Sequence, residues 1–167
     1  MTVTSHVSIN KSITLDLNGK TFAVDIKDVA DGDDAIWVRD NAEVTIKNGA
    51  VEVLNSDPSK TYGSAIFATG TSKLTIENVD VIGGGEAVFA QANAQVVING
   101  GTYKSTEHPE FTLNRRDGRP TDTATITVNG GSFHQFNPAD NAADGANTNY
   151  VAAGKTVTQN GDWYVVE

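Results

Sequence analysis

LTIENVDV (74–81) is the stretch that decides the fold, because the chain repeats its pattern. Leu74 and Ile76 are apolar and alternate with polar side chains, a polar corner follows, and Val81 is apolar again. The other copies are LDLNGKTF (15–22), VTIKNGAV (44–51), VVINGGTY (96–103) and ITVNGGSF (126–133). All three positions are apolar in every copy, which indicates a fold built from stacked units of one kind.

Each copy predicts a strand that ends in a tight corner. The first apolar position holds Leu15, Val44, Leu74, Val96 and Ile126, the second holds Leu17, Ile46, Ile76, Ile98 and Val128, and the third holds Phe22, Val51, Val81, Tyr103 and Phe133. An apolar period of two is typical of a half-buried strand. Two residues after the second position come Gly19, Asn48, Asn78, Gly100 and Gly130. These residue types tolerate a left-handed backbone, so we expect the chain to bend there.

A second strand lies eight residues upstream of the first. The pairs are Val7 with Leu15, Ile36 with Val44, Ile66 with Leu74, and Val88 with Val96. Three of these upstream strands read as near copies, AIWV (35–38), AIFA (65–68) and AVFA (87–90). In the fifth copy we expect Phe111 and Leu113 to take this place, displaced by the loop RRDGRPTDT (115–123).

Two strands at a constant offset make one coil, and stacked coils bury each other's apolar faces. The sequence therefore predicts an all-β, single-stranded right-handed parallel β-helix of about five coils. An antiparallel sandwich also has short, closely spaced strands. The equal registers of the columns favour the β-helix, because sandwich strands need no repeated corner after the same apolar pair.

The chain reads as one domain with coils over residues 1–133 and a closing segment over 134–167. In YVAAGKTVTQNGDWYVVE (150–167) an Asn-Gly pair lies between apolar runs, which is a hairpin signal. We expect this β-hairpin-like cap to cover the last coil, since exposed strand edges invite association. The first coil begins almost at Met1, so we expect another chain to cover that end, or a longer chain to have been cut there.

Composition excludes several classes of function. Twelve basic and 21 acidic residues give a formal net charge of -9, which disfavours binding to nucleic acid or to anionic membranes. There is no cysteine, so neither disulfides nor thiolate metal sites hold the fold. No segment resembles a signal peptide or a membrane span, which predicts a protein made in the cytoplasm and not inserted in a membrane. No cofactor motif is present.

The words SITLDLNGKTF, LTIENVDV and NGGTY resemble the coils of pectin-lyase-like right-handed β-helix proteins over residues 1–133. That superfamily includes polysaccharide lyases and hydrolases, bacterial adhesins and phage spikes. The segment from Gly130 to Val166 is similar to the closing module of β-helix proteins from tailed phages and bacterial surface genes. The resemblance implies a virion protein, a head decoration or a fibre or spike module, that forms a homotrimer on the capsid.

One outward column holds carboxylates. Asp34, Ser64 and Glu86 each precede the apolar strand of their coil, so Asp34 and Glu86 lie two rungs apart, roughly 9 to 10 Å by rung spacing. Inverting glycosidases hold their two carboxyl groups about 6.5–9.5 Å apart. The sequence shows no aromatic platform beside this column, so solvated corner residues are the favoured interpretation. Asp34 and Glu86 remain the weak catalytic alternative.

Two charged stretches are candidates for binding. The run DGDD (31–34) offers Asp31, Asp33 and Asp34 as oxygen ligands for a hard cation, although it lacks the twelve-residue Ca²⁺ loop pattern. An acidic turn is the favoured interpretation there. In RRDGR (115–119), the residues Arg115, Arg116, Asp117 and Arg119 form the basic cluster of an acidic chain. Such a cluster suits an acidic partner or an anionic sugar, or it is an ordinary charged loop.

Three hypotheses for function follow. The first is a virion structural protein that oligomerises on the capsid surface and can adhere to the host surface. The second is a bacterial surface adhesin or carbohydrate-binding module, located at the cell surface and binding a surface glycan. The third is a polysaccharide hydrolase or lyase, which requires Asp34 and Glu86 or the acidic turn.

Overall fold

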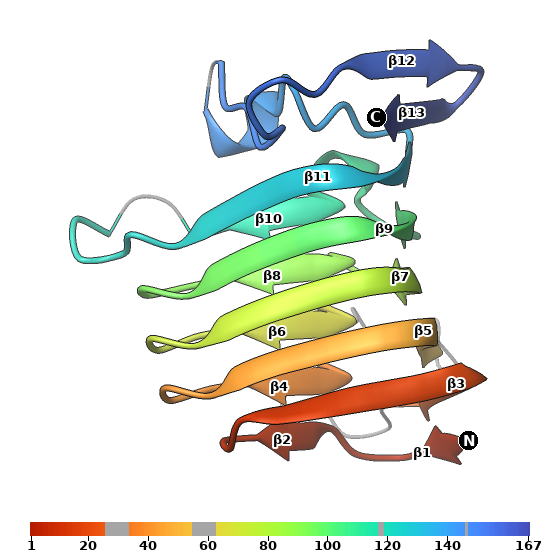
Figure 1. Ribbon diagram of the computed structural model, residues 1–167, viewed down its shortest axis with the longest axis vertical. Coiled ribbons are helices and arrows are strands. Elements are labelled where there is room, and N and C mark those ends of the chain that lie inside the picture. The colour runs from red at the N-terminus through yellow and green to blue at the C-terminus, as the bar shows by residue number, and fades with distance from the viewer. Residues whose placement is uncertain (26–33, 55–62, 117–118, 146) are drawn as a thin grey trace.

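The computed structural model describes residues 1–25, 34–54, 63–116, 119–145 and 147–167, and two stacked parallel sheets dominate it (Figure 1). The long strands are β3 (Ile13–Asp25), β5 (Glu43–Leu54), β7 (Lys73–Gly83), β9 (Gln95–Ser105) and β11 (Thr125–His134). The short strands are β2 (Val7–Ile9), β4 (Ile36–Val38), β6 (Ile66–Ala68), β8 (Val88–Ala90) and β10 (Leu113–Arg115). The remaining strands are β1 (Thr2–Val3), β12 (Val157–Asn160) and β13 (Trp163–Val166).

The chain alternates between a short and a long strand, as a β-helix does. Sheet A has the order β1-β3-β5-β7-β9-β11-β13-β12, and sheet B has the order β10-β8-β6-β4-β2. The predicted all-β parallel β-helix is therefore confirmed. The chain makes about four turns, slightly fewer than the five coils expected. There are five pairs of one short and one long strand, and the chain passes four times from one pair to the next.

Helix contributes little to the described residues. The helical elements there are two 3-10 turns of three residues each, η2 (Pro109–Phe111) and η3 (Ala142–Asp144). None of the helices in this part of the chain has the length and apolar character that crossing a membrane would require.

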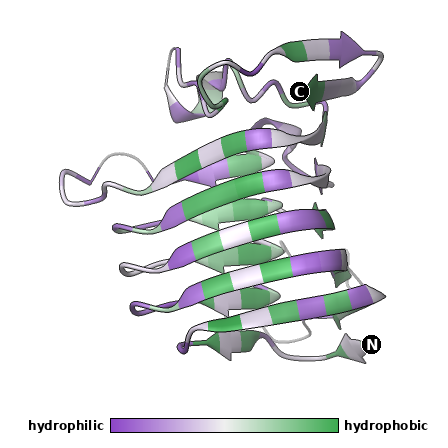
Figure 2. Ribbon diagram, in the orientation of Figure 1, coloured by the Kyte–Doolittle hydropathy of each residue, from purple (hydrophilic) through white to green (hydrophobic). Residues whose placement is uncertain are grey.

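Apolar columns fill the space between the two sheets, and Figure 2 shows apolar residues alternating with polar ones along the long strands. Ile46, Ile76, Ile98 and Val128 are fully buried and lie one above another in register. The rings of Tyr103 and Phe133 stack with centroids 5.0 Å apart. The Tyr103 hydroxyl donates a hydrogen bond to the Gly100 carbonyl oxygen at 2.9 Å, which offsets the cost of burying it.

The register of the first coil differs from the one predicted. Ile13 pairs with Val44 and Leu15 pairs with Ile46, two residues earlier than the columns read from the sequence. The shift is possible because β3 carries an irregularity after Asp16 that absorbs the extra residues. Beyond this bulge the third column is in the predicted register again.

Leu17 lies in the bulge of β3, and its side chain packs against the next coil. It is buried against Gly49, where a Cβ would stand 2.5 Å from the Leu17 Cβ. The apolar residue that the sequence placed in the second column thus packs at the corner. Ile13, at the outer end of the stack, stays 44% exposed.

The predicted left-handed corners are present in four coils. Asn48 and Asn78 have φ of 58° and 52°, and Gly19 and Gly100 also have positive φ. In the last coil the left-handed residue is Gly131, with φ of 128°. A register shift after Val128 gives β11 one more residue than β9 at this point, which moves the corner by one position. The prediction of Gly130 for that corner is therefore wrong by one position.

Of the two residues expected to form the short strand of the fifth coil, only one lies in that strand. Leu113 is fully buried in β10 and pairs with Val88, as the pattern predicts. Phe111 ends the 3-10 turn η2 instead and is partly exposed. The turn takes up the extra residues that precede β10.

A hairpin closes the last coil. Strand β13 pairs antiparallel with β11, and β12 pairs antiparallel with β13, so the predicted cap is present (Figure 1). Because Asn160 pairs with Trp163, the two loop residues are Gly161 and Asp162 instead of the Asn-Gly pair. Gly161 has φ of 60°, the conformation that the first position of a II′ turn requires.

The first coil has a short additional strand that sequence reasoning missed. Thr2 and Val3 of β1 pair in parallel with Ala23 and Val24 of β3. They cover the second half of β3 only. The apolar side chain of Val7, on β2, remains 39% exposed beside this edge.

Candidate functional site

An aromatic ladder runs along the outward face of sheet B. Trp37, Phe67 and Phe89 take the middle position of β4, β6 and β8, and they pair in register. The flanking residues of each strand are buried, so strand alternation turns these three rings outward. The ring centroids are 5.7 Å apart between Trp37 and Phe67 and 5.2 Å apart between Phe67 and Phe89, with interplanar angles of 21° and 18°.

The rings overlap only in part. Their centroid separations exceed the roughly 3.5–4.0 Å between carbon atoms in direct contact, which fits offset stacking and leaves part of each ring face uncovered. At one end, the ring of His6 meets Trp37 edge-on at 5.9 Å, and the Arg39 guanidinium lies 5.5 Å from the Trp37 ring centroid. The latter distance suits a cation–π contact.

The carboxylate column borders this ladder. The backbone N–H of Ser64 donates to Asp34 Oδ1 at 3.0 Å, and the Ser64 hydroxyl donates to Glu86 Oε2 at 3.4 Å. The column read from the sequence is thus a hydrogen-bonded chain that crosses three rungs. Both carboxylates are partly buried.

A shallow groove brings the column and the ladder together. It has a volume of about 330 Å³ and is lined by Asp34, Gly63, Ser64, Phe67, Glu86, Phe89 and Gln91. Sequence reasoning found the carboxylates and missed the aromatic platform. The signal was present as the third letter of AIWV, AIFA and AVFA, which alternation alone assigns to the outward face.

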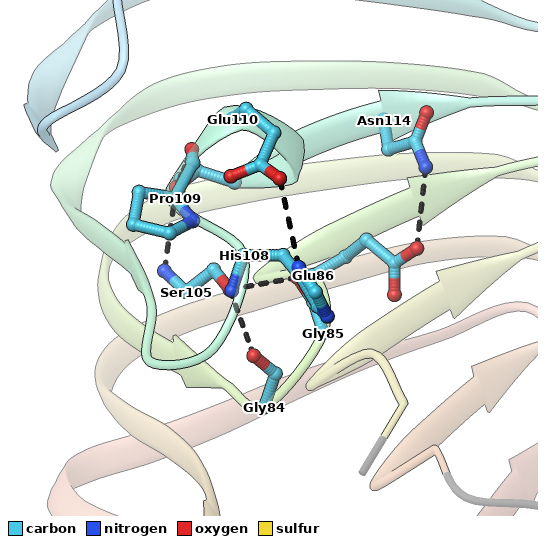
Figure 3. A network of polar contacts seen from close by, with 9 residues as sticks. Gly84, Gly85, Glu86, Ser105, His108, Pro109, Glu110 and Asn114 are labelled. Carbon is cyan, nitrogen blue, oxygen red and sulfur yellow. Dashed lines mark hydrogen bonds and ion pairs between the residues drawn. The ribbon is translucent and has the colours of Figure 1, made fainter. Parts of the chain in front are cut away.

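Glu86 is also held by contacts with β10 and with the segment before it, as Figure 3 shows. Asn114, on the next rung, donates from Nδ2 to Glu86 Oε1 at 3.2 Å. The hydroxyl of Ser105 lies 2.7 Å from the carbonyl oxygens of both Gly84 and Gly85, to which it donates, and it accepts from the backbone N–H of His108 at 3.0 Å. The corner that carries Glu86 is therefore anchored to β9 through a buried hydroxyl.

The same anchor holds the segment between β9 and β10. Thr112 is fully buried, and its hydroxyl donates to the Pro109 carbonyl oxygen at 2.9 Å. The Thr112 oxygen also accepts from the backbone N–H of Ser105 at 3.3 Å. His108 lies with Nδ1 3.5 Å from Glu110 Oε1, on the exposed side of this turn.

A polar column lies on the other side of the ladder. Its members donate their backbone N–H to the preceding rung in one repeated pattern, Arg39 to Ile9, Thr69 to Val38, Gln91 to Ala68 and Arg116 to Ala90. The outward face of sheet B thus has three parallel stripes. Carboxylates flank the aromatic rings on one side, and two arginines, a threonine and a glutamine flank them on the other.

The arginines of the basic cluster predicted at 115–119 lie in different surroundings in the structure. Arg115 turns toward the cap, with Nε 3.5 Å from Asp144 Oδ2, a carboxylate that is 2% exposed. Arg116 follows β10 in the polar column, and Arg119 begins a turn in which its carbonyl oxygen accepts from Asp122 N at 2.9 Å. Asp117 lies outside the described residues.

The predicted acidic turn is described only at its last residue, Asp34, which lines the groove. Asp31 and Asp33 lie outside the described residues. Within the described ranges, no three His, Cys, Asp or Glu side chains are grouped so that they could hold a metal ion. His6 contacts Trp37, His108 contacts Phe111 and His134 contacts Trp163, so the three histidines lie at separate places.

The surroundings of Asp16 and of Tyr103, both away from the groove, shift the pKa values of these side chains. The backbone N–H of Asn18, then the side chains of Asn48 and Lys47, lower the pKa of Asp16. Burial, with a smaller contribution from the charge of Asp80, raises the pKa of Tyr103 far above its usual value, so this side chain stays neutral.

Comparison with known protein families found no family model that matches the chain, and searches of curated proteins and of solved structures found no match either.

Proposed function

We propose that the chain is a rigid structural and adhesive rod that binds a carbohydrate chain on the outward face of sheet B. The observation that carries this proposal is that Phe67 and Phe89 lie beside Asp34 and Glu86 in one groove. Aromatic rings accept the apolar faces of sugar rings, while carboxylates and amides hydrogen-bond to the hydroxyl groups.

Rigidity supports binding in this arrangement. The rings belong to strands paired on both sides, and hydrogen bonds from Ser64 and Asn114 hold Glu86. A site whose side chains are already ordered loses less conformational entropy when a ligand binds. The stacked coils repeat one geometry along the rod, which suits a ligand that is itself a chain of repeating units.

The direct test is a screen of neutral, amino and acidic oligosaccharides, followed by calorimetric titration of the ligands found. We expect Phe67→Ala to weaken binding about tenfold or more, because removing a stacked aromatic contact costs roughly 0.5–1.5 kcal/mol beyond its buried area. The matched control is Thr45→Ala, at an outward position of sheet A. The proposal fails if no glycan binds, or if both variants bind as the unmodified protein does.

The place of display is a separate proposal that rests on the sequence resemblance. We infer a virion component, a head decoration or a fibre or spike module, that forms a homotrimer on the capsid; the alternative is display at a bacterial cell surface. The exposed apolar side chains of Val7 and Ile13 on the first coil support a contact with another chain. Light scattering across a concentration series tests this: a stable trimer is expected, and a monomer at all concentrations contradicts it.

Hydrolysis is the competing use of the same groove, since it contains two carboxylates. A binding module leaves the length of a bound polysaccharide unchanged on prolonged incubation. If the chains shorten, and if Asp34→Asn abolishes the shortening while glycan binding persists, the groove is catalytic and the adhesive proposal is wrong.

A further inference from the structure

Asn-Gly pairs recur at the corners of the rod, and this dipeptide is chemically labile. The pairs occupy 18–19, 48–49, 99–100, 129–130 and 160–161. The glycine nitrogen attacks the side-chain carbonyl carbon of the asparagine, a C–N bond forms, and ammonia leaves. Water then opens the cyclic succinimide to aspartate or isoaspartate. Glycine favours the attack because it has no side chain and its backbone is permissive.

Hydrogen bonds hold the asparagine side chain in three of the pairs. Asn129 Nδ2 donates to Asn99 Oδ1 at 2.8 Å, which engages both amides. Asn48 Nδ2 donates to Asp16 Oδ1 at 3.3 Å. These contacts must break before the side chain can turn onto its own main chain. The asparagines of the other two pairs make no side-chain hydrogen bond to any residue that the structure describes.

The space around the glycines divides the pairs in the same way. A Cβ added to Gly49 or Gly100 would meet a neighbouring atom at 2.5 Å or 2.6 Å, and at Gly130 the nearest such atom is at 3.7 Å. At Gly19 and Gly161, nothing among the described residues lies within 4 Å of that position. Of the five pairs, these two have both residues exposed. Hydrogen bonding and crowding thus select the same two pairs.

We infer that Asn18 and Asn160 are sites of spontaneous deamidation, whereas the stack of coils protects Asn48, Asn99 and Asn129. The five pairs are equal in their own sequence, so the fold makes the difference between them. The inference is independent of carbohydrate binding.

Both sites lie where the chain opens at little cost. Asn18 lies in the irregularity of β3 between Asp16 and Lys20, which has no register partner in β5. Asn160 ends β12, the outermost strand of sheet A, and its register partner is Trp163 of the same hairpin (Figure 1). Local opening at the ends of elements needs far less free energy than unfolding of the whole domain.

Deamidation at Asn160 alters the cap. Isoaspartate there adds a methylene carbon to the main chain directly before a two-residue loop, whose turn type depends on its length. Loosening the hairpin uncovers the strand edge of the last coil, and exposed edges invite association. Each deamidation also replaces a neutral amide with a carboxylate, so two events change the formal net charge from -9 to -11.

The test follows the pairs by mass spectrometry while the folded protein is kept in mildly alkaline buffer. Trypsin, which cleaves after lysine and arginine, releases Asn18 in the peptide 12–20 and Asn160 in the peptide 156–167, and neither contains a second asparagine. Fragment ions separate Asn160 from Gln159. We expect both sites to convert at least about tenfold faster than the three protected ones, a difference of about 1.4 kcal/mol in barrier.

Two controls separate the fold from the local sequence. In concentrated urea the five rates should approach one another, because unfolding removes the hydrogen bonds and the crowding. Asn160→Gln closes a larger ring and reacts more slowly, so this variant should keep its melting temperature during the incubation. Asn18→Gln is the matched variant, and it should lose stability on incubation as the unmodified protein does, because its cap still carries Asn160.

Each outcome supports or overturns the inference. Two fast sites in the folded protein and similar rates in urea support it. Five similar rates in the folded protein overturn it, as does faster conversion at any of the three protected sites than at Asn18 and Asn160. A ranking that is unchanged in urea also overturns it, since the neighbouring sequence would then be the cause. None of these results bears on glycan binding.

Discussion

Gly83 lies so close to Glu86 that a Cβ added to Gly83 would overlap the carbonyl oxygen of Glu86. The chain folds back on itself at this point, where β7 ends and the corner that carries Glu86 begins. The position of a carboxylate in the candidate groove thus depends on the absence of a side chain three residues earlier.

We therefore expect Gly83→Ala to destabilise the protein by about 1–3 kcal/mol or more, the usual cost of forcing extra atoms into a packed site. Thermal unfolding monitored by circular dichroism measures this. Gly130→Ala is the matched control, because a Cβ there meets only Val166 O at 3.7 Å and Gly130 is not left-handed. Equal melting temperatures for the two variants would show that the Gly83 corner relaxes freely.

Ile76 tests the apolar columns at the centre of the stack. It is fully buried between Ile46 and Ile98. We expect Ile76→Asp to prevent folding, because a buried charge without a partner costs several kcal/mol or more. Its neighbour Thr75 faces outward, so Thr75→Asp should leave the far-ultraviolet spectrum and the solubility unchanged. A soluble Ile76→Asp variant with an unaltered melting curve would contradict the column assignment.

The parts of the fold that the sequence predicted are those governed by local pattern. A period of two and a constant offset identify the second column in coils two to five, since only one register there turns the apolar residues inward. In the first coil, Ile13, Leu15 and Leu17 are all apolar at alternate positions. Two registers satisfy the same pattern, and the packing of Leu17 onto Gly49 decides between them.

The candidate site was predictable only in part for a related reason. Asp34 and Glu86 share a repeat position, so their column could be read from the sequence. The contact of Asn114 with Glu86 joins residues 28 positions apart across an irregular segment, and no repeat marks it. The aromatic ladder was readable in principle, but it becomes a platform only because the groove joins it to the carboxylates.

Acid should weaken the fold in part through Asp16. In the folded state the backbone N–H of Asn18, followed by Asn48 and Lys47, stabilises the charged carboxylate and lowers its pKa. A group with a lowered folded pKa adds stability above its unfolded pKa of about 3.9 and loses that contribution as pH falls through the folded value. Asp16→Asn should therefore be less stable than the unmodified protein at neutral pH.

Urea unfolding at a series of pH values measures the effect. The difference in free energy of unfolding between Asp16→Asn and the unmodified protein should shrink as pH falls below about 4. A difference that stays constant from neutral pH to about pH 2 would mean that the contacts of Asp16 do not depend on its charge.

Ser105 links the stability of the rod to the geometry of the groove. Its side chain is 1% exposed and connects β9 to the carbonyl oxygens of Gly84 and Gly85, directly before Glu86. Ser105→Ala removes the donor from both carbonyl groups and the acceptor from the His108 N–H. Leaving such buried groups unsatisfied costs about 1–3 kcal/mol.

We expect Ser105→Ala to lower the melting temperature and, because the corner of Glu86 loses its anchor, to weaken glycan binding at a temperature where the variant is still folded. Ser132→Ala, at an outward and partly exposed position of β11 in sheet A, makes the same chemical change without either effect. If Ser105→Ala melts earlier but binds glycan unchanged, the hydroxyl stabilises the coil alone and Glu86 is positioned by Asn114 and Ser64. If binding falls while the Ser132→Ala control binds normally, the buried hydroxyl is a positioning group for the groove, acting through the backbone of Gly84 and Gly85.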